Sequence, residues 1–439
     1  MMREISFQCH VRLNELTPDG LGKGPILSAR PTGDAESVER PVFDDLLRRC
    51  FPDGSLTIVG GLPGEEVIVE GRVLLAPPAS PGTRRRRWKL MPRLTLRQVL
   101  VASPWRVMAP CPHFGICGGC QYQHIRYDRQ LSLKQERVRT LLINHGFADP
   151  PVLPTIGCPI PWHYRNQMRF SVDRHGRLGL TIHGTREVFP VDHCFIAHER
   201  INSTLAVLQM RPNRPPQVVI RCGVSTGQVL VQPAPDEVTA AQLHTAGIDL
   251  HTEFLEEKLA GKTFRIRPSS FFQTNTAQAE RMVELIIRGL CASSESTVVD
   301  AYCGVGTFTL ALAAYCGYVI GIEESASAVQ DARANLAETP NVTIIQGKTE
   351  HVLPGLEGRV DGIVLDPPRQ GCQRLVLETL ARQHIPRLVY VSCDPQTLAR
   401  DLAILCHELQ AYRLMEVQPL DMFPQTVHIE CVATLEAHL

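Results

Sequence analysis

Hydrophobic and polar residues alternate near the start of the chain. Over residues 3–13 one face is apolar, and a second strand-rich stretch runs from Leu56 to Leu75. The apolar face of the first stretch consists of Ile5, Phe7, Cys9, Val11 and Leu13. Alternation bounded by glycine and proline predicts a small β-barrel over residues 1–76. Residues 28–52 are polar and contain proline, so we interpret them as an insertion in this barrel.

The pattern changes after a predicted linker at residues 77–82. Residues 111–120 are rich in cysteine and glycine, and a helical pattern follows from about Tyr127 to Asn144. Short apolar runs then alternate with turns up to about residue 260, for example Met168–Val172 and Gln217–Ile220. We therefore expect a central α+β domain over residues 77–262.

Strands alternate with helices in the last part of the chain, residues 263–439. The predicted helices cover residues 277–290 and 326–336, and the predicted strands cover residues 297–300, 319–323, 342–345 and 362–365. Such alternation is typical of a doubly wound, largely parallel sheet. The fold class is therefore α/β in this C-terminal domain.

Composition restricts the class of protein. The 439 residues have a formal net charge of zero, so a nucleic-acid surface would have to be local, and the basic run at residues 84–89 is the first candidate. We expect a cytoplasmic protein without a membrane segment, because no long apolar stretch and no signal peptide stand out. Fifteen cysteines then favour reduced, metal-bound or catalytic thiols over disulfides.

Three short motifs each close an apolar run near the C-terminus. They centre on Asp366, Cys393 and Glu430, and we expect these side chains at strand edges of one sheet. A cysteine attacks as its thiolate, and a neighbouring carboxylate raises the pKa of the thiol. Glu430 is therefore a poor activator of Cys393. The pattern predicts that Cys393 adds to an electrophilic carbon and that Glu430 removes a proton from the adduct.

A glycine turn follows the first strand of this sheet. Residues 300–309 join a strand to a helix and contain Gly304 and Gly306, so the backbone can approach a ligand at the carboxyl edge. Glu323 ends the next strand, where a carboxylate can accept hydrogen bonds from ribose hydroxyls. Thr309 stands at the third glycine position of the dinucleotide pattern. The turn therefore predicts a nucleoside cofactor, and Asp300 with the later Asp-Pro-Pro-Arg favours S-adenosylmethionine over a nicotinamide.

The order and spacing of several motifs resemble the RNA uracil-5 methyltransferase family, whose members make 5-methyluridine in ribosomal and transfer RNA. The motifs are Leu62-Pro63-Gly64-Glu65, the cysteines of residues 111–120, Tyr164-Arg165-Asn166, Phe271-Phe272-Gln273-Thr274-Asn275, the turn at residues 300–308, Asp-Pro-Pro-Arg, Ser-Cys-Asp-Pro and His-Ile-Glu. The resemblance implies a TRAM or OB-like barrel, a central iron–sulfur domain and a C-terminal Rossmann-like class I methyltransferase domain.

The resemblance also assigns roles residue by residue. Cys393 would attack C6 of a flipped uracil, and Glu430 would remove the C5 proton after methyl transfer. Asp366 would contact the methionine part of the cofactor or the uracil edge. The residues expected to line the S-adenosylmethionine site are Gln273, Tyr302, Gly304, Thr307, Glu323 and Asp366. Some relatives have asparagine at the position of Thr307.

A cysteine set implied by the same resemblance would hold a [4Fe–4S] cluster. Its members are Cys111, Cys117, Cys120 and the distant Cys194. Four thiolates suit such a cluster, and they would also suit structural zinc. We expect a cluster that shapes the RNA-facing surface rather than one that transfers electrons.

The expected substrate is a uridine in RNA. Within the family, the barrel and the cysteines together resemble the 23S ribosomal RNA enzymes, with transfer RNA as the alternative. Trp88 and Trp162 are candidates for contacts to the RNA strand. Two other classes are an RNA-binding protein with a decayed site and a DNA cytosine-5 methyltransferase. We expect a monomer.

Overall fold

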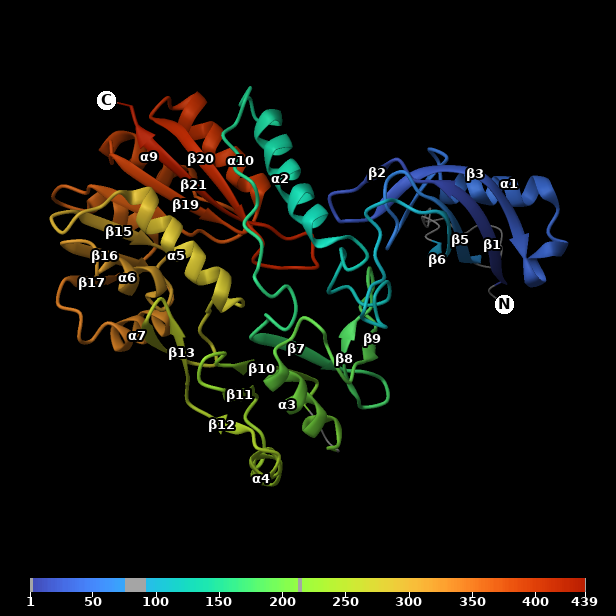
Figure 1. Cartoon of the computed structure of the whole chain (residues 1–439), viewed down its shortest axis with the longest axis horizontal. Helices are drawn as coiled ribbons and strands as arrows, with labels where there is room; N and C mark the ends of the chain where they lie inside the picture. The colour runs from blue at the N-terminus through green and yellow to red at the C-terminus, as the bar shows by residue number, and fades with distance from the viewer. Residues whose placement is uncertain (1–2, 76–91, 212–214, 439) are drawn as a thin grey trace, which may run out of the picture. The chain divides into compact units, whose positions relative to one another are not determined.

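The computed structural model describes residues 3–75, 92–211 and 215–438. The chain forms two compact units, one of residues 1–129 with 425–427 and one of residues 130–424 with 428–439 (Figure 1). The three-domain division with boundaries at 76/77 and 262/263 stays a prediction. Within the described residues, no helix is long and apolar enough to cross a membrane.

The first unit is built on a six-stranded antiparallel sheet. Its strands are β1 (Arg3–Arg12), β2 (Glu15–Leu16), β3 (Gly22–Thr32), β4 (Ser55–Ile58), β5 (Glu66–Leu75) and β6 (Arg93–Val101). The alternating face of residues 3–13 is buried as predicted, and Phe7 and Val11 are fully enclosed. Closure of this sheet into a TRAM-like barrel stays a prediction.

Residues 28–52, interpreted above as an insertion, contribute to the core of this unit. They contain the end of β3, a short 3₁₀ turn η1 (Gly33–Ser37) and helix α1 (Arg40–Cys50). Phe43 and Leu46 on the inner face of α1 pack on the sheet, and the Phe43 ring lies edge-on to Phe7. The polar residues that suggested an insertion lie on the outer face of this amphipathic helix.

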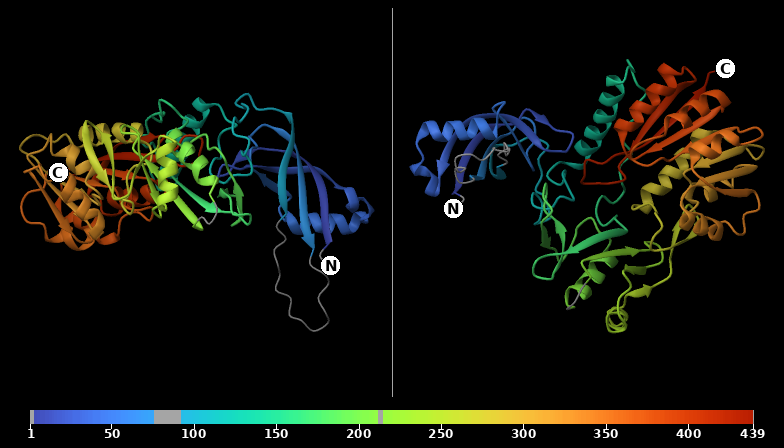
Figure 2. Two further views of the ribbon diagram at one scale, coloured as in Figure 1. Left: turned by 90° about the horizontal axis from the view of Figure 1, so that it is seen from below. Right: turned by 180° about the vertical axis from the view of Figure 1, so that it is seen from behind.

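The second unit contains a six-stranded central sheet in the order β12-β11-β10-β7-β8-β9. Figure 2 shows this sheet, in green, separate from the C-terminal sheet in orange and red. Its strands are β7 (Gln167–Val172), β8 (Leu178–Thr181), β9 (Val188–Pro190), β10 (Gln217–Cys222), β11 (Gln228–Gln232) and β12 (Asp249–His251). The helices of this part are α2 (Tyr127–Asn144), α3 (Glu199–Gln209) and α4 (Glu237–Thr245), and the hairpin β13 (Leu255–Leu259) and β14 (Lys262–Ile266) follows.

The C-terminal sheet has seven strands in the order β17-β16-β15-β18-β19-β21-β20. They are β15 (Thr297–Ala301), β16 (Tyr318–Glu323), β17 (Val342–Gln346), β18 (Gly362–Leu365), β19 (Arg387–Ser392), β20 (Tyr412–Leu420) and β21 (Glu430–Ala437). Strands β15 to β19 are parallel, whereas β20 and β21 are antiparallel to their neighbours. The largely parallel sheet predicted from sequence is confirmed, with an antiparallel pair at one edge.

Helices cover both faces of this sheet. They are α5 (Thr276–Leu290), α6 (Thr307–Leu312), α7 (Ala326–Asn335), α8 (Thr349–Val352), α9 (Arg374–Gln383) and α10 (Pro395–Ala403), with a 3₁₀ turn at 353–355 and a π-turn at 404–408. Val298 of β15 packs in one core with Met282 of α5, while the next residue, Val299, packs in a second core with Leu398 of α10. Because successive strand side chains point to opposite faces, one strand serves both cores.

Candidate functional site

The carboxyl edge of the C-terminal sheet carries the three motifs singled out from sequence. Asp366 follows β18, Cys393 follows β19, and Glu430 is the first residue of β21. Glu430 therefore begins a strand, whereas the sequence pattern suggested that it closes an apolar run. Because β21 runs antiparallel to β19, its first residue lies at the edge where β18 and β19 end.

Strand register sets Cys393 beside Glu430. The β19–β21 ladder pairs Ser392 with Cys431, so continuing it by one residue places Cys393 opposite Glu430. Cys393 is half-buried in the turn before α10, whose first backbone amides are capped by Asp394, with Gln396 N–H donating to Asp394 Oδ1 at 2.9 Å. The thiol therefore lies on a rigid strand-to-helix turn.

Electrostatics at this edge disfavour ionisation. Burial, with the carboxylates of Glu430 and Asp366, raises the pKa of the Cys393 thiol to about 11, and Arg369 opposes the rise. Burial and the nearby Asp366 raise the pKa of Glu430 well above its usual range. Burial and Asp300 raise the pKa of Asp366 to about 7. The free site therefore favours a protonated thiol, and both acids hold their protons more tightly than usual.

The glycine turn after β15 has the conformation of a ligand-binding turn. Tyr302, Gly304 and Gly306 all have positive φ angles, of 68°, 56° and 86°. Glu323 at the end of β16 accepts Gly304 N–H at 3.0 Å on Oε2 and Ser325 N–H at 2.8 Å on Oε1. Each oxygen of the Glu323 carboxylate retains a lone pair that can accept a further hydrogen bond.

A buried carboxyl beneath this turn is only partly satisfied. Asp300 Oδ2 accepts the Thr309 hydroxyl at 2.5 Å, while Oδ1 has no partner within the part of the chain that the structure describes. Burial raises the pKa of Asp300 to about 7. Thr309, which occupies the third glycine position of the dinucleotide pattern, therefore has a structural reason to be threonine. Asp300 Oδ1 and the Glu323 carboxylate offer hydrogen-bond acceptors, and the glycine turn lets the backbone approach a ligand. These features fit a nucleoside, whose hydroxyl and amino groups donate hydrogen bonds.

Gln273, just before α5, and Thr307 are both largely buried. The Gln273 backbone is held by Asn166, whose Nδ2 donates to Gln273 O at 2.9 Å and whose N–H donates to Thr274 O at 3.0 Å. Thr307 begins α6. Two motifs that were recognised separately in the sequence, around Asn166 and around Gln273, thus form one contact.

The loop at residues 111–120 in the first unit aims backbone amides at cysteine sulfur. Gly119 N–H donates to Cys117 Sγ at 3.4 Å. Burial raises the pKa of the Cys111 thiol, and amides of His113 and Phe114 oppose this rise by hydrogen bonding to it. Such N–H···S contacts also stabilise thiolates that bind metal. Cys194 belongs to the second unit, before α3.

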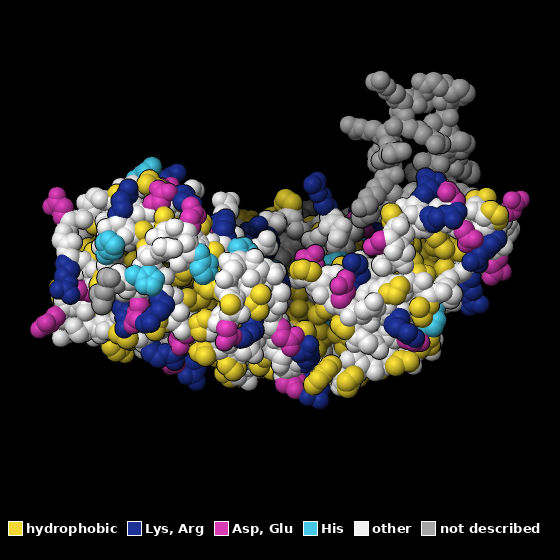
Figure 3. Space-filling view, turned by 90° about the horizontal axis from the view of Figure 1, so that it is seen from above, with side chains coloured by type: hydrophobic (Ala, Val, Ile, Leu, Met, Phe, Trp, Pro, Cys, Tyr) yellow, Lys and Arg dark blue, Asp and Glu magenta, His cyan; other side chains and the backbone are white. Residues whose placement is uncertain are grey.

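The other predicted RNA contacts are the basic run and Trp162. The basic run at residues 84–89, including Trp88, lies outside the described residues. Trp162 is half-buried, and its ring packs edge-on to Phe195 with centroids 6.5 Å apart. On the face drawn in Figure 3, Lys and Arg side chains of the described residues are interspersed with Asp and Glu.

Another group could offer metal ligands. His163, His193 and Glu199 place one ligand atom each within 4.8 Å of one another. His163 Nδ1 and Glu199 Oε1 are 2.9 Å apart, and Glu199 is well exposed. These two side chains form an ion pair when His163 is protonated, which accounts for their closeness.

Two ion pairs were missed by sequence reasoning. Glu65, in the Leu-Pro-Gly-Glu motif, is fully buried and accepts hydrogen bonds from Arg106 Nε at 2.5 Å and Leu62 N–H at 2.9 Å. Lys134 on α2 is buried against Asp421, 2.5 Å away. Neither pair is close in sequence, and lysine in a helical pattern is usually exposed, so no local signal identifies these contacts.

The strand order and the position of the site define a methyltransferase-type α/β fold. Residues 239–438 match the family model described as tRNA (Uracil-5-)-methyltransferase. An uncharacterized RNA methyltransferase of Gloeobacter violaceus is 37% identical over 436 residues, covering 86% of this chain and 94% of that protein. One from Listeria innocua is 32% identical, covering 88% and 93%. The chain belongs to the RNA uracil-5-methyltransferase family.

A solved structure shares the fold. The tRNA (uracil-54, C5)-methyltransferase of Pyrococcus abyssi, in complex with S-adenosyl-L-homocysteine, aligns with a TM-score of 0.67 at 23% sequence identity. The alignment covers 97% of this chain and 100% of that one. The α/β methyltransferase fold expected from sequence is therefore confirmed.

Proposed function

We propose that this protein methylates C5 of a uridine in RNA through a covalent bond between Cys393 and C6 of the base. The observation that carries the proposal is the placement of the Cys393 thiol opposite Glu430 and beside Asp366, at the edge that also bears the glycine turn. Covalent addition is needed because C5 of an aromatic uracil is a weak nucleophile until C6 is saturated.

S-adenosylmethionine, when bound, supplies the methyl group from its sulfonium. The Glu323 carboxylate would hold the ribose, the backbone at Gly304 would approach the nucleoside, and Gln273, Tyr302, Thr307 and Asp366 would complete the site. The free acceptor of Asp300 and the open lone pairs of Glu323 support this assignment.

The chain's own groups perform the remaining steps. Cys393 releases its proton to solvent and forms the S–C6 bond, and the electron pair of the C5–C6 double bond becomes available at C5 for the methyl group. Glu430 then takes the C5 proton, the C–H electrons restore the C5–C6 bond, and the S–C6 bond breaks to return the thiolate. A base inside folded RNA must leave its stack to reach Cys393, so the substrate uridine is flipped.

The Cys393 and Glu430 roles are tested with labelled S-adenosylmethionine and RNA from a strain lacking the gene. Cys393→Ala should abolish methyl transfer, and Glu430→Gln should accumulate a protein–RNA adduct on denaturing gels. Cys406→Ala, at another half-buried thiol, and Glu436→Gln, at the other end of β21, are matched controls that should behave as wild type. Turnover by the Cys393 variant would reject the mechanism.

The RNA substrate we propose is 23S ribosomal RNA. The β-rich first unit together with the four cysteines supports this choice. Transfer RNA is the second candidate, favoured by the description of the matching family model and by the substrate in the name of the Pyrococcus abyssi protein. Mapping 5-methyluridine in both RNA pools of a deletion strain separates them. We further propose that the protein acts as a cytoplasmic monomer.

Cys111, Cys117, Cys120 and Cys194 are proposed to hold a [4Fe–4S] cluster with a structural role. The amides directed at Cys111 and Cys117 support thiolate ligands. Anaerobically purified protein should contain iron and acid-labile sulfide, and Cys117→Ser should lose both while Cys291→Ser, at an exposed cysteine, keeps both. Bound zinc without sulfide would reject the cluster.

A further inference from the structure

Three consecutive backbone carbonyls precede the active-site acid, and each accepts a hydrogen bond from a different buried side chain. Asn275 Nδ2 donates to Met422 O at 3.1 Å, Lys134 Nζ donates to Phe423 O at 3.2 Å, and Tyr164 OH donates to Pro424 O at 3.1 Å. The carbonyls belong to the connection between β20 and β21, which leads from Asp421 to Glu430.

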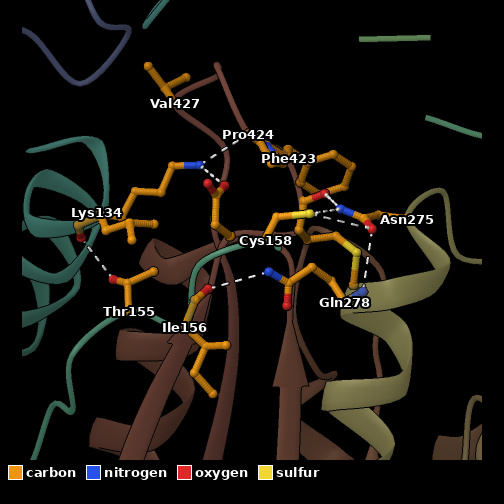
Figure 4. A network of polar contacts seen from close by, with 12 residues as sticks. Lys134, Thr155, Ile156, Cys158, Asn275, Gln278, Phe423, Pro424 and Val427 are labelled. Atoms are coloured by element: carbon orange, nitrogen blue, oxygen red, sulfur yellow. Dashed lines mark hydrogen bonds and ion pairs between the residues drawn. The ribbon is translucent and has the colours of Figure 1, made fainter. Parts of the chain in front are cut away.

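The three donors come from separate parts of the second unit. Lys134 lies on α2, Tyr164 lies before β7, and Asn275 is the N-cap of α5. All three are buried, with exposed fractions of 1%, 7% and 1%. Figure 4 shows Lys134 and Asn275 approaching the Phe423–Pro424 segment from opposite sides. We call Lys134, Tyr164 and Asn275 the carbonyl clamp.

The clamp also fixes the start of the connection and the segment that carries Gln273. Lys134 Nζ lies 2.5 Å from Asp421 Oδ1, and Asp421 N–H donates to Ile156 O at 2.9 Å. Asn275 follows Gln273 by two residues, and its Oδ1 caps α5 by accepting Gln278 N–H at 3.4 Å. One side chain therefore ties the Gln273 segment to the connection that ends at Glu430.

Stability alone does not explain the Lys134–Asp421 ion pair. Both side chains are almost fully enclosed, and Asp421 Oδ2 has no partner among the residues described. A buried ion pair with an unsatisfied oxygen is often no better for stability than apolar residues of similar volume, whereas its geometry is specific. The specific geometry of this pair instead holds the backbone segment that leads to Glu430.

We infer that the carbonyl clamp positions Glu430 for removal of the C5 proton, so that Lys134, Tyr164 and Asn275 are positioning residues for the elimination step. The inference rests on the function proposed above and adds the residues that position Glu430, the proton acceptor. Addition uses Cys393, which lies on a separate turn after β19. Loss of a clamp contact should therefore slow release of the thiolate more than it slows formation of the adduct.

The test follows a single turnover with labelled S-adenosylmethionine and RNA from a strain lacking the gene. Adduct formation and adduct decay are measured separately on denaturing gels. Tyr164→Phe removes one donor and keeps the ring, and we expect decay to slow about fivefold, the effect of one lost neutral hydrogen bond, with formation unchanged. Lys134→Met should slow decay further.

A matched control removes the same hydroxyl elsewhere. Tyr412 is buried at the far end of β20 and donates to Ile385 O at 3.0 Å, so Tyr412→Phe should leave both rates unchanged. A general loss of structure would reduce the active fraction or both rates together. Tyr164→Phe remains informative if Lys134→Met does not fold.

Glu430→Gln in the same assay separates the two proposals. If Glu430→Gln traps the adduct and Tyr164→Phe decays at the wild-type rate, the clamp inference is wrong and the proposed function stands. If Glu430→Gln traps no adduct, the proposed function fails, and the inference fails with it.

Discussion

Cys393 and Glu430 lie opposite each other because β21 runs antiparallel to β19, with Ser392 paired to Cys431. The thiol, just after β19, and the acid, at the start of β21, are thus placed by the register of two adjacent strands. Their proximity also raises the pKa of Cys393, since a carboxylate disfavours the thiolate. The arrangement fits an acid that acts after the thiol has bonded to the base.

The reactivity of Cys393 should depend steeply on pH. Its thiol pKa of about 11 leaves a small thiolate fraction near neutrality, so alkylation by iodoacetamide should accelerate about tenfold per pH unit from pH 7 to 9. Arg369→Met removes the cation that lowers this pKa and should slow alkylation at pH 8. Mass spectrometry of the Cys393 peptide measures the rate. Arg374→Met, at an exposed ion pair, is the control, and an equal loss there would contradict the prediction.

Asp366 should make stability fall as pH rises toward neutrality. Its folded pKa of about 7 exceeds the unfolded value of about 3.9, so its contribution is complete below pH 4 and is lost as pH rises through 7. Between those pH values, Asp366→Asn should lose less unfolding free energy than the wild type does. Urea denaturation at a series of pH values measures this difference. Asp19→Asn, at an exposed carboxyl, should follow the wild-type profile.

Glu65 should stabilise the first unit through its buried contact with Arg106. Burial raises the pKa of Glu65, but hydrogen bonds from Arg106, Ser103 and Leu62 lower it overall. Glu65→Gln should cost about 3 kcal/mol of unfolding free energy at pH 7, with the difference shrinking as pH falls below about 4. Hydrogen exchange in residues 3–75 reports the loss. Glu66→Gln, the same change at a half-buried neighbour that pairs with Arg12, should have a smaller effect.

Variants of the Lys134–Asp421 pair should change the free energy of unfolding and the rate of adduct decay independently. Lys134→Met leaves a buried carboxylate and should cost about 3 to 5 kcal/mol in urea denaturation. Lys134→Met with Asp421→Leu should recover most of this loss, because an apolar pair fills the same space. Adduct decay should stay slow in the double variant, since Phe423 O still lacks its donor. Recovery of both stability and decay rate would contradict the positioning role.

Local patterns predicted several helices and strands closely. Helix α2 spans Tyr127–Asn144, and β18 spans Gly362–Leu365, as expected from sequence. Each has a strong local signal, a period typical of a helix or a short apolar run between turns. Residues 28–52 gave no such signal, because the face of α1 that enters the core contains few apolar residues.

The sequence by itself determined the family, the α/β alternation and the residues with chemistry to offer, since motifs and periodicity are local properties of the chain. Only the tertiary structure decided that β21 is antiparallel, which brings Glu430 to the edge that holds Cys393. It alone also joined Lys134, Tyr164 and Asn275 at successive carbonyls. Contacts between residues far apart in sequence depend on strand order and burial, and these leave no periodic pattern in the sequence.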